Sequence, residues 1–139
     1  TNVAAGLNRG VDPGGASLSA PTRFVVAVAA NPGAVDQERE QSRFRWKAEA
    51  GADLAVTQPV FDVGALRRFL DATAEHPLPV LVGLWPFVSL RNAEFLAYEV
   101  PGMAVPDRVL ERMRKAQSGG PAAARAEWIS PGMPTESRT

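Results

Sequence analysis

Three short apolar segments recur along the chain, and a helix-forming stretch follows each of them. The segments are FVVAVAA (Phe24–Ala30), LAVTQ (Leu54–Gln58) and PVLVGLW (Pro79–Trp85), and they recur about every 26 to 29 residues, the length of one strand–helix unit. Continuous runs of this composition are typical of strands that are buried on both faces of a parallel sheet. No hairpin signal separates them, so we expect parallel pairing with right-handed crossovers.

The stretches between and after these segments carry helix signals, such as a capping residue before an amphipathic pattern or a glycine after it. The expected helices cover residues 36–50 before Gly51, a stretch from Asp62 to before Pro77, a stretch that Ser89 caps, and a stretch from Pro106 to about Gln117. Three strands are too few to complete such a sheet, because both edges would remain unpaired and apolar. We therefore expect an α/β fold that forms part of a barrel or of an open sheet.

The two ends of the chain differ from this middle part. Residues 8–22 are rich in glycine and proline without an apolar period, so we expect residues 1–23 to form a loop that enters the domain. The strand–helix domain itself is expected over residues 24–117. Residues 118–139 lose the pattern and are expected to be a poorly ordered tail.

Composition excludes several classes of function. Acidic and basic residues balance at 15 each, which argues against nucleic acid or a membrane surface as a partner held by bulk charge. The chain has no cysteine and one histidine, His76, so thiolate metal sites and most histidine-based chemistry are excluded. No apolar run reaches the roughly 18 residues that span a membrane, and no leader is visible. We expect a cytoplasmic protein without a metal site.

Ligands in parallel α/β folds bind at the carboxyl ends of the strands. Here those ends are Ala29-Ala30-Asn31, Thr57-Gln58 and Leu84-Trp85. Gln58 ends an otherwise apolar strand, and its amide both donates and accepts, which suits the edge of a heterocycle. It can equally satisfy the backbone of the loop that follows, and spacing alone does not favour either interpretation.

Other polar residues have simpler interpretations. Glu40 and Lys47 lie seven residues apart, so a helix places them on one face, two turns apart. A solvated helix surface is the favoured interpretation of this pair, because the whole stretch is rich in charge. Asp12 is most simply a turn former, Asp62 a helix cap and His76 a surface residue at a helix end. No Gly-x-Gly-x-x-Gly or Walker motif is present, so a nucleotide-binding loop is not supported.

Four blocks, in matching order and spacing, resemble the methylenetetrahydrofolate reductase family. They are PTRFVVAVAANPGAVDQE, FRWKAEAGADLAVTQPVFD, GLWPFVSLRNAEFLAYEVPG and VPDRVLERM, and the resemblance covers roughly residues 6–117. The opening LNRGVDPGG resembles members in which the reductase follows a homocysteine methyltransferase domain in one polypeptide. The resemblance implies an eight-stranded (βα)8 TIM barrel, of which this chain supplies strands five, six and seven.

The resemblance also implies an activity. The family carries FAD and reduces 5,10-methylenetetrahydrofolate to 5-methyltetrahydrofolate with NAD(P)H as hydride donor, and the intact enzyme is expected to be a homo-oligomer. By resemblance, Gln58 contacts the folate, whereas Lys47 and Glu40 contact FAD. Ala29 and Ala30 match the small residues that let the backbone approach the flavin.

Two parts of the family's site have no counterpart in this sequence. The catalytic glutamate of the first strand and the Gly-Asp block of the fourth strand are absent, so no catalytic residue is expected here. Asn92 lies where some members have a folate-contacting glutamine, which is a departure from the family pattern. We therefore predict that the chain alone is inactive. The alternatives are a non-catalytic α/β interaction module and a part of another folate- or corrinoid-related βα-barrel enzyme.

Overall fold

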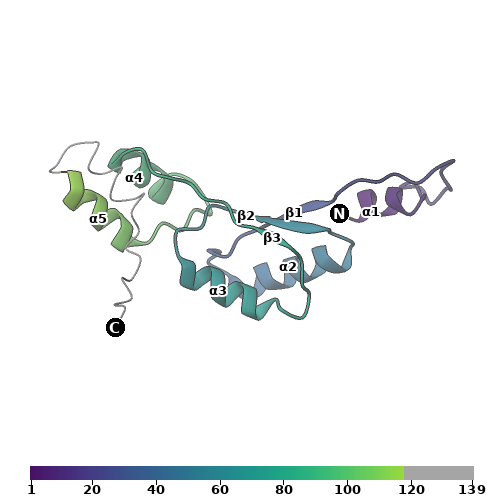
Figure 1. The fold of residues 1–139 in the computed structure, drawn as a ribbon, viewed down its shortest axis with the longest axis horizontal. Coiled ribbons are helices and arrows are strands. Elements are labelled where there is room, and N and C mark those ends of the chain that lie inside the picture. Colours follow the sequence, from purple (N-terminus) through teal and green to yellow (C-terminus); the bar gives the residue numbers. More distant parts are fainter. Residues whose placement is uncertain (118–139) are drawn as a thin grey trace, which may run out of the picture. The chain divides into compact units, whose positions relative to one another are not determined.

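The structure, a computed structural model, describes residues 1–117, so the expected tail at 118–139 lies outside the described residues. The chain divides into two compact units, Thr1–Gly83 and Leu84–Thr139. The elements in order are α1 (Asn2–Asn8), β1 (Ala27–Ala30), α2 (Gln37–Glu49), β2 (Leu54–Thr57), α3 (Val63–Ala72), β3 (Val80–Leu81), α4 (Leu90–Tyr98) and α5 (Asp107–Gln117) (Figure 1). Apart from α1, this is the order that the sequence predicts.

The three strands form one sheet in the order β1-β2-β3, and both pairings are parallel as expected. Each ladder is shorter than the apolar segment that predicts it, because side chains replace backbone bonds at the strand ends. The Asp53 carboxylate accepts from the Val26 N–H (2.7 Å) at the start of β1. The Thr57 hydroxyl accepts from the Gly83 N–H (2.9 Å) beyond β3. The mixed α/β class is thus confirmed, although the strands are shorter than the apolar segments.

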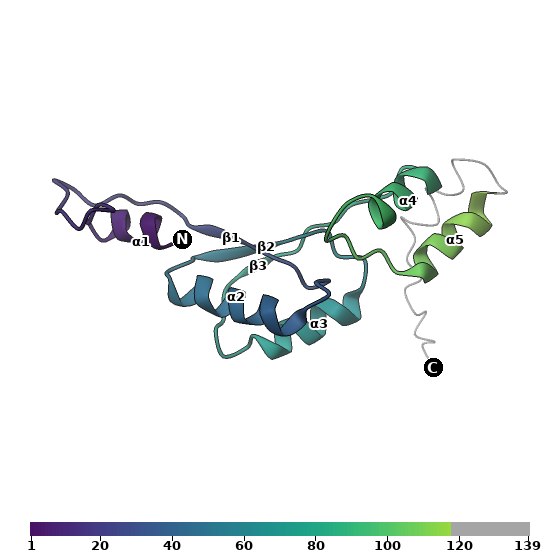
Figure 2. The ribbon, with the colours of Figure 1, turned by 180° about the vertical axis from the view of Figure 1, so that it is seen from behind.

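Two phenylalanines attach the helices to the sheet. Phe44 is the buried residue of α2 and Phe69 that of α3. Their rings meet edge to face, with centroids 5.3 Å apart and planes at 85°, a geometry that adds about 0.5–1.5 kcal/mol to the burial itself. They pack with four small or branched side chains of the sheet and its loops, namely Val28, Ala30, Ala52 and Ala55. Figures 1 and 2 show α2 and α3 side by side on the same face of the sheet.

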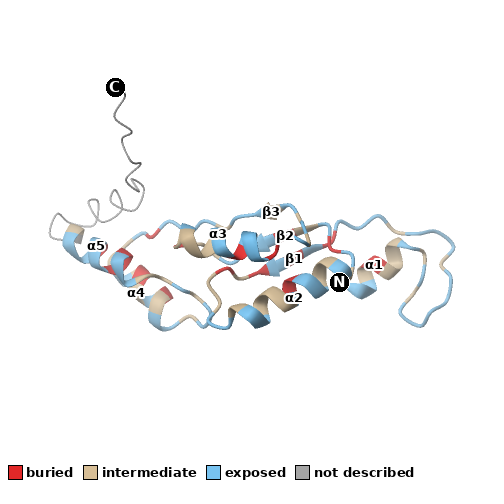
Figure 3. Cartoon of the chain, turned by 90° about the horizontal axis from the view of Figure 1, so that it is seen from below, coloured by how far each residue is buried: buried red, intermediate tan, exposed pale blue. Residues whose placement is uncertain are grey.

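The second face of the sheet is exposed in the described part of the chain. Burial alternates along β1 and β2, and the residues between the buried ones are exposed or half-buried (Figure 3). Val25 keeps 72% and Leu81 60% of its surface accessible to solvent. The expectation of strands buried on both faces is therefore wrong for this chain, because α2 and α3 cover one face only.

Local capping signals in the sequence are confirmed. The Asp62 carboxylate accepts from the Gly64 N–H (2.8 Å) at the start of α3, and Ser89 Oγ accepts from the Asn92 N–H (3.1 Å) at the start of α4. Gly51 follows α2 with a φ of 88°, a left-handed conformation that favours glycine. Capping depends on residues near each other in sequence, which is why the pattern predicts it well.

The first 23 residues are not loop throughout, since they begin with α1. Asn8, at the end of this helix, binds the backbone of Phe24 with both ends of its amide: Nδ2 donates to the carbonyl (2.7 Å) and Oδ1 accepts from the N–H (2.8 Å). Asp12 forms the expected turn, because its Oδ1 accepts from the N–H groups of Gly14 and Ala16 (both 2.8 Å). Asn8 thus binds the backbone of the segment that leads into β1.

The described part of the second unit contains α4 and α5. Ala93 and Leu96 of α4 are buried, as are Leu110 and Met113 of α5. Glu94 accepts from Arg114 (2.9 Å) and joins the two helices at the surface. Hydrogen bonds raise the pKa of Arg114 above its ordinary value. The bond with Tyr98 has the larger effect, and the bond with Glu94 the next largest. Among the described residues, no helix has the length and apolar character required to cross a membrane.

Gly83 allows the close approach that ends the sheet. A Cβ atom at this position would lie 2.7 Å from the Thr57 carbonyl oxygen, which is closer than real Cβ atoms come. The Val60 N–H donates to the Gly83 carbonyl (3.0 Å), so the backbone cannot move away freely. A side chain here must therefore displace the backbone at Thr57 or at Gly83 itself.

We predict that Gly83→Ala lowers the free energy of unfolding by about 1–3 kcal/mol, because backbone must shift to relieve the overlap. Urea denaturation followed by tryptophan fluorescence measures the change. Gly6→Ala in α1 is the matched control: its Cβ would lie 3.4 Å from the Val11 carbonyl oxygen, an ordinary contact, and alanine favours helix. Equal stability of Gly83→Ala and the unmodified chain would contradict the prediction.

Candidate functional site

Gln58 lies immediately after β2, and neighbouring strands fix its backbone. Its N–H donates to the Ala30 carbonyl at 2.8 Å, which continues the β1–β2 pairing by one residue. Its side chain is exposed and forms no hydrogen bond with the other described residues. The interpretation that Gln58 satisfies the following loop thus finds no support in the described contacts. The amide remains available to a ligand.

The Thr57 side chain, on the face of the sheet that α2 and α3 cover, binds backbone at the same strand end. Its side chain is buried, with 6% of the residue exposed, and its Oγ1 accepts the Gly83 hydrogen bond described above. In the continued β2–β3 register, Gly83 stands beside Gln58. From the sequence, Thr57 is identified only as part of a strand end. The sequence feature that could have identified Thr57 is the strand alternation, which places this hydroxyl on the buried face of β2.

Glu40 and Lys47 both reach the carboxyl end of β1 from α2. Lys47 Nζ donates to the Ala29 carbonyl (2.7 Å), and Glu40 Oε1 accepts from the Asn31 N–H (3.0 Å). The Nζ and Oε1 atoms lie 4.0 Å apart, and the side chains are only 22% and 12% exposed. The predicted solvated helix surface is therefore wrong for this pair. The sheet side of α2 carries them because Glu40, Phe44 and Lys47 follow the i, i+4, i+7 spacing of one helix face.

The two alanines of the β1 end differ in their surroundings. Ala29 is exposed on the open face of the sheet, whereas Ala30 is 1% exposed and belongs to the hydrophobic core. Ala29, Ala30, Glu40, Lys47 and Gln58 nevertheless gather within one region, through bonds to the ends of β1 and β2. Five of the six residues that the resemblance singles out are thus brought together by the first unit.

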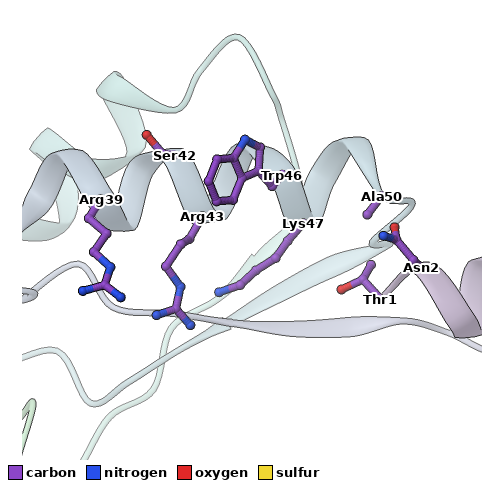
Figure 4. Close-up of a pocket in the computed structure, with 8 residues that line it drawn as sticks. All are labelled: Thr1, Asn2, Arg39, Ser42, Arg43, Trp46, Lys47 and Ala50. Atoms are coloured by element: carbon purple, nitrogen blue, oxygen red, sulfur yellow. The ribbon is translucent and has the colours of Figure 1, made fainter.

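A hollow of about 610 Å³ lies along α2 on the side that includes Lys47. Its lining residues are Thr1, Asn2, Arg39, Ser42, Arg43, Trp46, Lys47 and Ala50 (Figure 4). In Figure 4 the side chains of Arg39, Arg43 and Lys47 extend to the same side of the helix. A row of cations beside an aromatic ring suits an anionic ligand with a planar ring, because guanidinium and ammonium groups bind phosphate oxygens.

Among these lining residues the sequence singles out only Lys47, and Arg39, Arg43 and Trp46 are the other charged or aromatic ones. The available signal is the spacing of Arg39, Arg43 and Lys47, four residues apart each time, which aligns three cations on one helix face. In a stretch rich in both charges, that row is difficult to separate from ordinary surface residues. The structure distinguishes it because the hollow adjoins the strand end that Lys47 binds.

Asn92 lies in the second unit. Its N–H binds the Ser89 hydroxyl in the first turn of α4. Its Oδ1 atom is buried and has no hydrogen-bond partner among the described residues. A buried acceptor without a donor is costly and uncommon. Because the atom is buried, it is not exposed to a ligand in this conformation.

Metal chemistry has no candidate site in the described part of the chain. No group of three or more histidine, cysteine, aspartate or glutamate side chains there has a geometry that could hold a metal ion. The candidate site consists instead of cations, amides and backbone groups. Such groups bind and orient a ligand by charge and hydrogen bonding.

Fold and site together define a parallel α/β protein whose candidate ligand groups lie at the carboxyl ends of adjacent strands. The family model for methylenetetrahydrofolate reductase matches residues 20–127, well over half of the chain. The chain therefore belongs to the methylenetetrahydrofolate reductase family, and this confirms the resemblance at the family level. No curated protein matches the chain. Family membership gives the chain an oxidoreductase lineage.

The Thr57 hydroxyl provides a direct test of how the strand end is held. Thr57→Val keeps the shape but leaves the Gly83 N–H without its acceptor, so we expect a loss of about 1–3 kcal/mol in the free energy of unfolding. Thr57→Ser keeps the hydroxyl and should retain most of the stability. Urea denaturation of the three proteins measures the effect. A Thr57→Val chain as stable as the unmodified one would show that this hydrogen bond contributes nothing.

Proposed function

We propose that the chain is part of an FAD-dependent oxidoreductase that reduces 5,10-methylenetetrahydrofolate to 5-methyltetrahydrofolate with NAD(P)H. The observation that carries the proposal is the placement of Lys47: it borders the cation-lined hollow and also binds the β1 end. Family membership supplies the reaction class. The contacts of the first unit support a site for an anionic cofactor at that strand end.

The residues present fit FAD. Arg39, Arg43 and Lys47 would hold its diphosphate by charge-assisted hydrogen bonds, and the Glu40 carboxylate would accept from ribose hydroxyls. The indole of Trp46 lines the same hollow and offers a surface for stacking. When bound, FAD supplies the hydride chemistry that no side chain of this protein can perform. The protein's own part is to bind and orient.

Folate binding is proposed for the amide of Gln58. The exposed Gln58 amide offers a donor and an acceptor to the edge of a pterin ring. The fixed backbone of Gln58, bound to Ala30 and flanked by Gly83, limits the positions that the amide can occupy. For Asn92, taken by itself in the second unit, a folate contact is proposed from the family resemblance alone. Since a side-chain amide does not titrate, neither residue can serve as the acid of the reaction.

For the fold we propose a partial (βα)8 TIM barrel over residues 24–117, with 1–23 leading into it. Two features support the barrel: both sheet edges lack a partner strand among the described residues, and the face opposite α2 and α3 is apolar and exposed. Further strands would cover both. An intact homo-oligomer, and a preceding homocysteine methyltransferase domain suggested by LNRGVDPGG, are further parts of this proposal.

A second candidate function is a non-catalytic α/β interaction module. The exposed sheet face with Val25 and Leu81 favours it, because such a surface can also be buried against a partner. Retention of FAD distinguishes the two candidates. A yellow purified protein supports the reductase lineage of the site, whereas a colourless protein that binds no added FAD and self-associates supports the module. Another folate- or corrinoid-related barrel enzyme is disfavoured by the family match.

Charge removal inside the hollow tests cofactor binding. We predict that Arg43→Met weakens FAD binding about tenfold or more, because a hydrogen bond between charged groups is lost. Quenching of flavin fluorescence on titration with the protein measures the affinity. Arg45→Met removes the same charge from an exposed position of α2 outside the hollow and should leave the affinity unchanged. Equal weakening by both variants, or no saturable quenching by the unmodified chain, would contradict the proposal.

We also predict that the 139-residue chain does not turn over methylenetetrahydrofolate when FAD and NAD(P)H are supplied. A positioned general acid contributes about 10²–10⁴-fold to such reactions, and none of the residues proposed for the folate contact can act as one. Formation of 5-methyltetrahydrofolate is the measurement, with a full-length member of the family as the positive control. Turnover above the rate without protein would show the prediction to be wrong.

A further inference from the structure

Side chains of α2 bind the outward-facing backbone groups at the carboxyl end of β1. Among residues 1–117, β1 is an edge strand in the order β1-β2-β3, and an edge strand presents unpaired N–H and C=O groups to any other strand. Successive residues of a strand point their backbone groups to opposite edges. The Ala30 carbonyl accepts from the Gln58 N–H and so points toward β2. The Ala29 carbonyl and the Asn31 N–H therefore point to the outer edge.

Both of these outward groups are bound by charged side chains of α2. Lys47 Nζ is the donor to the Ala29 carbonyl at 2.7 Å, and Glu40 Oε1 is the acceptor for the Asn31 N–H at 3.0 Å. A neighbouring strand would present the same two functions, a donor and an acceptor, at these places. The pair thus takes the place of backbone groups from a further strand.

The backbone bonds matter more than the attraction between the two charges. The Nζ and Oε1 atoms are 4.0 Å apart, and an ion pair of this separation near the surface contributes little. The two bonds to the backbone are shorter, and each involves one ionised partner, which makes them stronger than neutral hydrogen bonds. The side chains are also largely buried, so water competes weakly for these groups.

We propose that Glu40 and Lys47 terminate the outer edge of β1 and hold its carboxyl end in place. Any further strand that pairs with this edge can use the groups of Val25 and Ala27 but must stop before the Ala29 carbonyl. The strand end is thereby kept open beside the cation-lined hollow. This role goes beyond the proposed function, because it needs neither FAD nor folate and is complete in the free protein.

Amide hydrogen exchange in the 139-residue chain without added ligand tests the proposal. In Glu40→Ala the Asn31 N–H loses its acceptor, and its exchange should accelerate about tenfold or more. Glu40→Gln keeps an oxygen acceptor but removes the charge, so Asn31 should stay protected. The Gln58 N–H, bound to the Ala30 carbonyl, serves as the internal reference for an intact sheet. Unchanged exchange at Asn31 in Glu40→Ala, with the reference intact, would overturn the proposal, as would equal acceleration in both variants.

Self-association provides a second measurement that does not depend on the Asn31 amide. Lys47→Met frees the Ala29 carbonyl and lengthens the open edge, so sedimentation velocity should show more association at high protein concentration than in the unmodified chain. Arg45→Met is the matched control, because it removes one positive charge from α2 without touching β1. Association equal to that of Arg45→Met would overturn the role of Lys47. Failure of FAD binding leaves both measurements unaffected, so the two proposals fail separately.

Discussion

The edge-to-face contact between Phe44 and Phe69 is the interaction on which the rest of the first unit depends. Each ring is the buried residue of its helix, and together they fix α2 and α3 to one face of the sheet. Glu40 and Lys47 lie four residues before and three residues after Phe44, on the same side of α2. Burying Phe44 therefore brings both charged side chains against the end of β1. The apolar contact places the polar site.

The strand ends show how side chains can bind backbone groups where a small parallel sheet stops. Asp53 binds the backbone where β1 begins, Lys47 and Glu40 bind it where β1 ends, and Thr57 continues the pairing beyond β3. Each of these side chains satisfies a group that would otherwise need another strand or water. The same bonds fix the backbone near Gln58. The side chains that bind the strand ends therefore also position the candidate site.

Local features were predictable, and features that depend on distant partners were not. Asp62, Ser89 and Gly51 act on residues within a few positions of themselves, so their roles follow from the sequence. The lengths of the strands do not, because they depend on bonds from Asp53 and Thr57 to segments far away in the chain. The third strand end illustrates this: β3 covers only Val80–Leu81, and Leu84-Trp85 begin the second unit.

By itself, the sequence determined the α/β class, the order of the strands and helices, and the family, because periodicity and ordered motifs persist without a folded context. It also indicated Gln58 as a polar end to an apolar strand. Only the tertiary structure decided that Glu40 and Lys47 face the sheet, that Arg39 and Arg43 join Lys47 around one hollow, and that one sheet face is exposed. The sequence cannot distinguish a charged helix residue that faces water from one that faces a strand. Burial of Phe44 determines which side of α2 faces the sheet, and therefore where Glu40 and Lys47 lie.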